Sequence, residues 1–262
     1  MKISKKDFLV QVKYADIPAD VNRMDECFSG FGGELYLSPE EMLNHSGRIM
    51  DNIKTFSGER GLALRLHAPV LEIDYSQPAE SLARMAPVYE NARKLCRFLD
   101  ISSVVAHAEL DRIKDFPLTG RMENAAFIWD SLVGIMSGSG IGINIENHCE
   151  AEPSLLIGIF KKISSKYLGM CIDPGHFNVF SELSAEEWIE SYPPGSIREV
   201  HLADNKGDRD SHLPLGDGNI DFAALFNIFE KRDENPAYVL EPNNIAETQK
   251  SLSYLRGIVS IE

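Results

Sequence analysis

The stretch IGINIENHCEAEPSLLIGIFKKISSKYLGMCIDPGH, residues 141–176, contains the repeating unit that decides the fold. An apolar run rich in isoleucine at residues 141–146 is followed by a helix-length segment at 153–164 and by a second apolar run at 168–173. Short apolar runs separated by an amphipathic segment of this length are typical of parallel βα units. The stretch therefore predicts a strand, a helix and a second, parallel strand.

The same alternation extends from this unit to both ends of the chain and gives eight expected βα units. The other expected strands cover residues 9–13, 34–37, 62–67, 103–107, 197–201 and 238–241. The other expected helices cover residues 19–28, 39–56, 78–99, 122–137, 185–191, 222–231 and 245–259. Eight units in 262 residues match a closed barrel, and the sequence lacks the glycine-rich phosphate loop of a doubly wound sheet. We therefore expect an α/β fold, a (β/α)₈ TIM barrel that forms a single domain over residues 1–262.

Composition limits the classes of protein to which the chain can belong. The apolar stretches are shorter than the roughly 20 residues that cross a bilayer, and the N-terminus lacks a secretory signal, so we expect a cytoplasmic protein without a membrane span. The four cysteines show no CxxC pairing, which indicates reduced thiols. A net charge of −14 disfavours nucleic acid as a partner without excluding it, because a local basic patch can oppose the net charge.

Side chains that can bind a metal ion stand at the ends of six consecutive expected strands: His67, His107, Glu146, Asp173, His201 and Glu241. The strand ends of a barrel surround one active-site mouth, so these side chains are expected to meet there. Three more candidates follow strand ends closely: His176, Asp210 and His212. Imidazoles mixed with carboxylates suit Zn²⁺ or Mn²⁺, and we expect one to three such ions per chain.

Two charged residues are expected to point into the barrel below this layer. Glu34 and Arg65 would be costly to bury unpaired, so they should pair with each other or with Glu199 and Asn144. Such a network would orient the metal ligands above it, and changing Arg65 should loosen metal binding.

Further strings from the same regions resemble the xylose isomerase-like barrel superfamily, which joins sugar isomerases and epimerases with endonuclease IV. The resemblance covers essentially the whole chain. It is carried by LHAP (66–69), VVAHAE (104–109), INIENH (143–148), CIDPGH (171–176), VLEP (239–242) and above all HLADNKGDRDSHLPLGDGNIDF (201–222).

The two branches of this superfamily imply different metal centres. Resemblance to endonuclease IV implies three metal positions, and the nine residue types match: His67, His107 and Glu146; Glu146, Asp173, His201 and Glu241; and His176, Asp210 and His212. Resemblance to the isomerases and epimerases implies one ion held by Glu146, Asp173, His201 and Glu241, with Glu146 and Glu241 as the catalytic acid and base.

We favour a metal-dependent isomerase or epimerase of a sugar or sugar phosphate. A small carbohydrate is then the expected partner, with Lys206 and Arg209 as candidates for binding its phosphate or carboxylate, and an oligomer remains open. The first alternative is a multinuclear zinc phosphodiesterase of the endonuclease IV type, which would explain His67 and His107. The loop at residues 70–77 argues against this alternative. An enzyme that opens a DNA duplex inserts side chains between the bases, and Tyr75 is the only aromatic residue of that loop. The second alternative is a metal-binding barrel without turnover, which would have a closed mouth.

Overall fold

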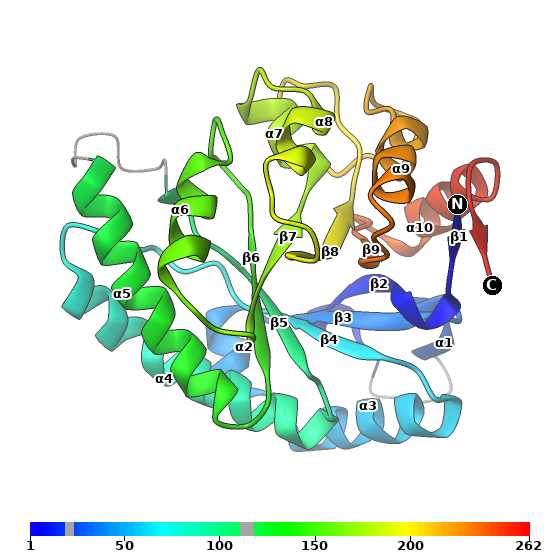
Figure 1. Ribbon diagram of the computed structural model, residues 1–262. Helices are drawn as coiled ribbons and strands as arrows, with labels where there is room; N and C mark the ends of the chain where they lie inside the picture. Colours follow the sequence, from blue (N-terminus) through cyan, green and yellow to red (C-terminus); the bar gives the residue numbers. More distant parts are fainter. Residues whose placement is uncertain (19–23, 111–117) are drawn as a thin grey trace.

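The structure is a computed structural model that describes residues 1–18, 24–110 and 118–262 (Figure 1). Eight parallel strands close into a barrel in which each strand pairs with its neighbours in the sequence and the last pairs with the first. These strands are β2 (Phe8–Lys13), β3 (Gly32–Tyr36), β4 (Leu64–His67), β5 (Ser103–His107), β6 (Gly142–Glu146), β7 (Leu168–Ile172), β8 (Ile197–Leu202) and β9 (Ala237–Leu240). The predicted (β/α)₈ barrel is confirmed.

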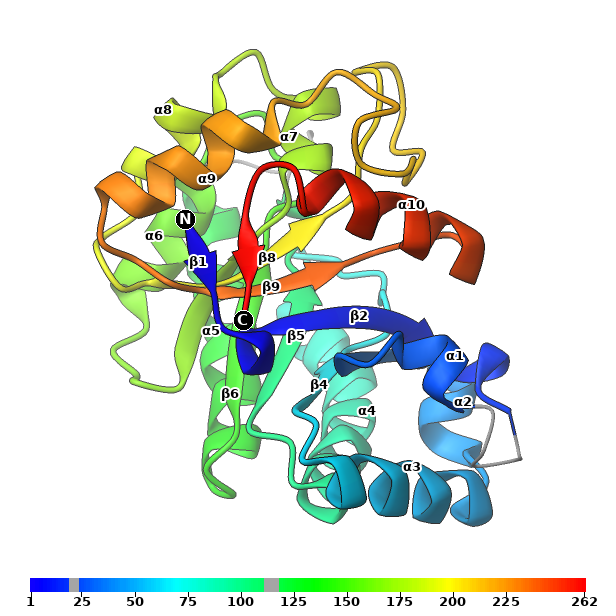
Figure 2. The same ribbon diagram turned by 90° about the vertical axis from the view of Figure 1, so that its right-hand side faces the viewer.

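Helices surround the barrel on its outside, as the two views in Figures 1 and 2 show. The α-helices are α1 (Met24–Phe28), α2 (Pro39–Asn44), α3 (Gly47–Arg60), α4 (Pro78–Leu99), α5 (Leu118–Ser137), α6 (Ser154–Lys162), α7 (Pro174–Phe180), α8 (Ala185–Glu190), α9 (Phe222–Lys231) and α10 (Ile245–Leu255). Two 3₁₀ helices, η1 (Lys5–Asp7) and η2 (Tyr14–Asp16), flank β2. The first expected helix began at residue 19, and its first five residues lie outside the described ones.

The prediction of one helix over residues 39–56 was wrong, because the chain forms α2 and α3 instead. His45 and Ser46 adopt extended backbone angles between the two helices, and the Ser46 N–H donates a hydrogen bond to the Tyr14 hydroxyl at 2.7 Å. This contact with another part of the chain replaces a helical hydrogen bond, which the local sequence pattern could not reveal. The short helix α7, also unexpected, begins where the Asp173 carboxylate accepts hydrogen bonds from the N–H groups of Gly175 and His176.

The two ends of the described chain lie side by side (Figure 2). Strand β1 (Lys2–Ile3) pairs in parallel with β10 (Ser260–Ile261) and forms a small second sheet outside the barrel. The Lys2 ammonium is 2.9 Å from the Glu262 carboxylate, which adds an exposed ion pair at the same place. This sheet attaches the N-terminal segment to the segment that follows α10.

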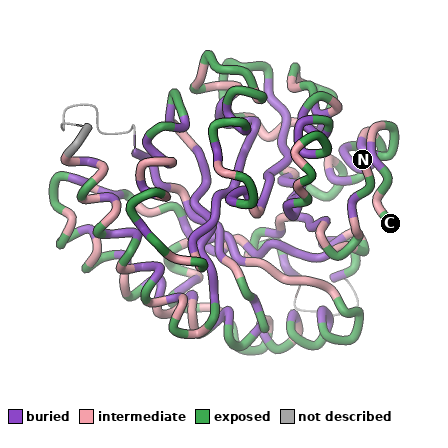
Figure 3. The backbone as a smooth tube through the Cα atoms, viewed as in Figure 1, coloured by how far each residue is buried: buried purple, intermediate pink, exposed green. Residues whose placement is uncertain are grey.

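Alternation along the strands separates an apolar outer layer from a polar interior. The outward-facing residues pack with the helices in one large buried cluster, which includes Leu66, Ala106, Ile145, Ile172 and Val200. Inside the barrel a separate small cluster of Leu9, Ala237 and Val239 fills part of the space. The burial map in Figure 3 shows the strands buried along most of their length, whereas the helices expose one face. Metal-capable side chains at the strand ends are therefore held on a rigid, buried frame.

Across the described residues, no helix combines the length and the apolar character needed to cross a membrane.

Candidate metal centre

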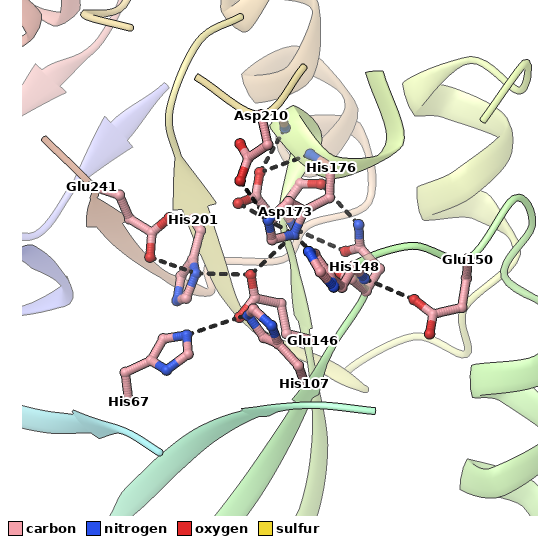
Figure 4. A network of polar contacts seen from close by, with 12 residues as sticks. His67, His107, Glu146, His148, Glu150, Asp173, His176, His201, Asp210 and Glu241 are labelled. Atoms are coloured by element: carbon pink, nitrogen blue, oxygen red, sulfur yellow. Dashed lines mark hydrogen bonds and ion pairs between the residues drawn. The ribbon is translucent and has the colours of Figure 1, made fainter. Parts of the chain in front are cut away.

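Glu146, at the end of β6, is the centre of the group that the strand ends bring together (Figure 4). Its Oε2 lies 3.3 Å from His67 Nε2 and 3.1 Å from His107 Nε2. Its Oε1 lies 3.2 Å from His201 Nδ1 and 3.3 Å from His176 Nδ1. One fully buried carboxylate is thus surrounded by four imidazoles, three of them from strand ends and one from α7.

His201 connects Glu146 with Glu241, the residue that follows β9. The same His201 Nδ1 that faces Glu146 lies 3.0 Å from Glu241 Oε1, and Figure 4 shows the imidazole between the two carboxylates. Asp173 follows β7 and lies with its Oδ2 3.6 Å from His176 Nδ1. Its other oxygen, Oδ1, accepts the hydrogen bonds that cap α7, so only Oδ2 is left to bind a metal ion.

The loop after β8 adds Asp210 and His212 to the group. Asp210 Oδ2 lies 3.1 Å from His212 Nε2 and 3.5 Å from His176 Nε2. The loop is fixed by the buried Asp204, whose carboxylate accepts hydrogen bonds from the N–H groups of Gly216 and Gly218, each at 2.9 Å. All nine metal-capable residues of the sequence prediction therefore lie in one cluster of the structure.

The spacing of these atoms fits a divalent metal ion. Two ligand atoms at about 2.05 Å from a tetrahedral ion lie roughly 3.3 Å apart, close to the nitrogen–oxygen distances given above. Both oxygens of Glu146, Oδ2 of Asp173 and Nδ1 of His201 are buried and have no hydrogen-bond partner among the described residues. Buried polar atoms rarely remain without a partner, so a cation would satisfy all four atoms at once.

Electrostatics at the centre favour ionised glutamates. Burial alone would raise the pKa of Glu146, but the charges of His201 and His107 hold it well below its ordinary value. Burial would likewise raise the pKa of Glu241, yet His201 lowers it to about 2. Asp173 differs, since burial raises its pKa to about 6 in spite of the His176 charge.

The imidazoles that face these carboxylates hold their protons strongly when no metal is bound. Burial would lower the pKa of His67, but the Glu146 carboxylate beside it and Glu34 raise that pKa to about 9. Burial would also lower the pKa of His212, which Asp210 and Glu241 raise to about 9. The pKa of His201 rises well above its ordinary value despite burial, through Cys171 and the two glutamates.

Metal affinity should therefore increase with pH, because a metal ion binds only the neutral imidazole. A histidine with a raised pKa is protonated at pH 7 and must lose that proton before it can ligate. Apparent affinity for Mn²⁺ or Zn²⁺ is expected to rise about tenfold per pH unit for each displaced proton between pH 6.5 and 9. Titration calorimetry in buffers of different ionisation enthalpy measures the released protons. Binding without proton release at pH 7 would contradict the expectation.

A polar network lies directly beneath the layer of metal-capable side chains and confirms the expected pairing of Arg65 with Glu199. Its guanidinium lies 2.9 Å from the Glu199 carboxylate and donates a hydrogen bond to the Ser103 hydroxyl, and Asn144 donates to Glu199 at 2.8 Å. Glu34 accepts a hydrogen bond from Gln11 at 3.1 Å. The network joins the strands that carry Glu146 and His201, since Asn144 and Glu199 each precede those ligands by two residues.

Arg65→Met is expected to lower the free energy of unfolding by about 2–3 kcal/mol and metal affinity by about tenfold. The change leaves the buried Glu199 carboxylate without its counter-charge, and the partial exposure of Arg65 keeps the loss at the lower end of the range for a broken buried pair. Urea unfolding and metal titration measure the two effects. Arg48→Met, an exposed position on α3, is the control, and equal behaviour of the two variants would contradict a structural role for Arg65.

A pocket of about 400 Å³ opens over the cluster. Seven of the nine metal-capable side chains line it, all except Asp173 and His201. It is also lined by residues that the sequence did not single out for this role: Gln11, Lys13, Tyr36, Val70 and Glu109. His148 lines the pocket as well. Lys13 could have been found, because it continues the inward-facing positions of Leu9 and Gln11 on β2. Lys206 and Arg209 are exposed and do not line this pocket, so their part in substrate binding stays a prediction.

Comparison with known proteins gives the following matches. The family described as xylose isomerase-like TIM barrel matches residues 31–258. An uncharacterized protein of Methanocaldococcus jannaschii is 26% identical over 239 residues, which cover 87% of this chain and 78% of that protein. The solved structure of a D-tagatose 3-epimerase-like protein has a TM-score of 0.78 at 22% identity, covering 98% of this chain and 96% of that one. A protein of Thermus thermophilus, soaked with ZnCl₂, has a TM-score of 0.78 at 21% identity, covering 96% and 97%.

Proposed function

The chain belongs to the xylose isomerase-like TIM barrel family, and from this premise we propose that it is a divalent-metal-dependent isomerase or epimerase of a sugar or sugar phosphate. The similarity to a D-tagatose 3-epimerase-like protein supports a reaction of this class, and the pocket supports a small substrate. A volume of about 400 Å³ lies within the range of small-molecule sites, roughly 300–1,000 Å³. The described residues thus leave room for a sugar, which speaks against a barrel with a closed mouth.

The observation that carries the proposal is the placement of two buried glutamates on either side of one imidazole. Glu146 and Glu241 lie 3.2 Å and 3.0 Å from His201 Nδ1, and their strands are separated in the barrel by β7 and β8. Both glutamates line the pocket, so a substrate in it would meet a carboxylate from two directions. Two carboxylates on different sides of a carbon atom are what an epimerase needs to remove a proton from one face and return it to the other.

We assign the ion to Glu146, Asp173, His201 and Glu241. A Zn²⁺ or Mn²⁺ ion held there would polarise the substrate carbonyl and make the neighbouring C–H group more acidic. One of the two glutamates would act as the base in its ionised form, which the lowered pKa values of Glu146 and Glu241 favour, and the other would enter the reaction with the proton that it returns. Gln11 donates a hydrogen bond to Glu241 and to Glu34, which fixes the position of the Glu241 carboxylate.

In the proposed reaction one glutamate takes the proton from the carbon next to the carbonyl. The electron pair of that C–H bond forms a carbon–carbon double bond, and the carbonyl pair moves onto its oxygen. The other glutamate, protonated at the start, returns its proton to the opposite face of the same carbon, which gives the epimer and leaves that glutamate ionised. For the aldose or ketose isomer, a proton returns to the former carbonyl carbon instead. The hydroxyl proton of the neighbouring carbon then moves to the former carbonyl oxygen, so the carbonyl and hydroxyl groups exchange places. One proton is taken and one is returned, so no oxidant or reductant is needed.

Cationic side chains are available for a phosphate or carboxylate group of the substrate. Lys13 lines the pocket and makes no ion pair with the described residues. Lys206 and Arg209 lie exposed in the loop that carries Asp210, and we keep them as candidates for an anionic group that extends beyond the pocket. A phosphorylated substrate is consistent with these three charges.

A multinuclear phosphodiesterase is the second candidate, and the position of the remaining histidines favours it. His67 and His107 both face Glu146 Oε2, and His176 and His212 face Asp210, yet a centre with four ligands needs none of them. Tyr75, the only aromatic residue of the loop at 70–77, is fully buried and donates a hydrogen bond to the Ala108 carbonyl. It is therefore not available to open a duplex.

Metal analysis combined with two assays tests the proposal. Protein reconstituted with Mn²⁺ is offered a panel of ketoses and ketose phosphates and, separately, a DNA duplex that contains an abasic site. About one manganese ion per chain with ketose turnover is the expected result. Cleavage of the duplex by protein with two or three ions, without ketose turnover, would instead support the phosphodiesterase.

A further inference from the structure

His148 and Glu109 form a pair that none of the metal positions described above uses. His148 follows β6 by two residues and Glu109 follows β5 by two residues, and both line the pocket over the metal centre. His148 Nδ1 lies 3.3 Å from Glu109 Oε1. The Glu109 side chain is almost fully buried, with 2% of it exposed, whereas 21% of the His148 side chain is accessible. A ligand could therefore enter at His148 and remain held by a buried carboxylate.

The pair has the same geometry as the ligand pairs of the main centre. Its nitrogen–oxygen distance of 3.3 Å is close to the 3.2 Å between His201 Nδ1 and Glu146 Oε1, and it matches the roughly 3.3 Å between two ligands of one tetrahedral ion. His148 Nδ1 is buried and has no hydrogen-bond partner among the described residues, as is true of His201 Nδ1. A direct N–H···O hydrogen bond would be shorter, about 2.7–3.2 Å, and correctly oriented.

The third member of the group is His107. His107, Glu109 and His148 each place one possible ligand atom within 4.8 Å of the other two. The rings of His107 and His148 are stacked, with their centroids 4.8 Å apart. His107 Nδ1 is buried and has no hydrogen bond among the described residues. A reaction centre built from Glu146, Asp173, His201 and Glu241 does not need His107, which leaves this histidine for a second ion.

The backbone holds the group in place. Glu150 is buried, and its carboxylate accepts hydrogen bonds from the N–H groups of Leu110 and His148, each at 2.7 Å. It thereby joins the loop after β5 to the loop after β6, which carry Glu109 and His148. Glu109 itself has a left-handed backbone with φ of 51°, a conformation that costs a non-glycine residue roughly 1–2 kcal/mol. Such strained residues concentrate at functional sites.

We propose that His107, Glu109 and His148 form a further zinc position on the wall of the pocket, separate from the ion at Glu146, Asp173, His201 and Glu241. Two imidazoles and one carboxylate are a ligand set that suits Zn²⁺ and leaves one coordination position open. Mn²⁺ should occupy this position less readily, because two of its three ligands are imidazoles. Under this proposal zinc-loaded protein holds one ion per chain more than manganese-loaded protein.

Crystals of the full chain equilibrated with ZnCl₂, with diffraction measured at the zinc absorption edge, test the position directly. We expect an anomalous peak about 2.0–2.2 Å from ligand atoms of Glu109 and His148. His148→Gln and Glu109→Gln should each lose this peak and keep the peak at Glu146, which also shows that the variants fold. Elemental analysis of the same proteins in solution should show a loss of about one zinc per chain. Glu152→Gln, an exposed glutamate in the same loop as His148, should keep both ions.

A wild-type crystal without a peak between Glu109 and His148 would overturn the proposal, whatever the occupancy of the main centre. A zinc ion bound by His107 together with His67 and Glu146 would overturn it too, since His107 would then belong to the multinuclear arrangement. The proposal would also be overturned if the peak persisted in both His148→Gln and Glu109→Gln. Ketose turnover is measured separately, so a failure of this proposal leaves the proposed reaction untouched.

Discussion

Glu146→Gln is expected to lower the turnover number for a ketose or ketose phosphate by about 10³-fold, even with Mn²⁺ in excess. The substitution keeps the size of the side chain but removes the charge around which four imidazoles gather. It also removes one of the two carboxylates that we propose as carriers of the proton. The loss should therefore appear in kcat as well as in metal affinity.

Hydrogen exchange separates these two consequences of Glu146→Gln. In D₂O the variant keeps Glu241, so it should still exchange the proton of the epimer whose C–H bond faces Glu241, while the other epimer stays unlabelled. Glu241→Gln should show the opposite preference. Glu152→Gln serves as the control because it makes the same chemical change in the loop after β6, outside the pocket. Loss of exchange in both epimers at full metal occupancy would contradict the assignment of one glutamate to each face.

Most of the metal-capable cluster at the strand ends could be predicted from the sequence, because two independent structural rules apply to it. Alternation along a strand fixes which residues point inward, and the barrel brings all strand ends to one mouth. Glu146 and His107 are the last residues of β6 and β5, as predicted, and their apolar neighbours Ile145 and Ala106 pack outward. The buried pairing of Arg65 with Glu199 was predictable for the same reason, since an inward charge requires a partner.

Features that depend on contacts between distant segments could not be predicted in this way. The strands β1 and β10 have two residues each, too few to show a period, and they form only because the chain ends meet. The break between α2 and α3 depends on the Tyr14 hydroxyl, more than 30 residues away in the sequence. The approach of Glu109 to His148 depends on how two loops are joined by Glu150. Loop conformation is set by such tertiary contacts, which a local pattern does not encode.

Removal of the divalent ion with a chelator is expected to abolish turnover and to lower the melting temperature by roughly 10 °C at pH 8.5. Without the ion, the buried carboxylates of Glu146, Asp173 and Glu241 depend on protonated histidines for counter-charge. When the free concentration of the ion is about 10³ times its Kd, binding contributes about 4 kcal/mol to stability. Differential scanning calorimetry with and without Mn²⁺ measures the shift, and added Mn²⁺ should restore both turnover and melting temperature.

The increase in melting temperature that the divalent ion causes should grow as the pH rises, because of the pKa values of the histidines. His67 and His212 have a pKa of about 9 in the folded chain, above the value of 6.5 that holds in the unfolded chain. The stability that they add to metal-free protein is therefore complete below pH 6.5 and is lost as the pH rises toward 9. Because the ion takes over the counter-charge that the protonated His67 and His212 give to Glu146 and Glu241, it should raise the melting temperature little at pH 6 and most at pH 8.5–9. An equal shift at pH 6 and pH 8.5 would mean that the ion binds without displacing protons, and the assignment of the ion to the carboxylates of Glu146 and Glu241, which these imidazoles face, would then fail.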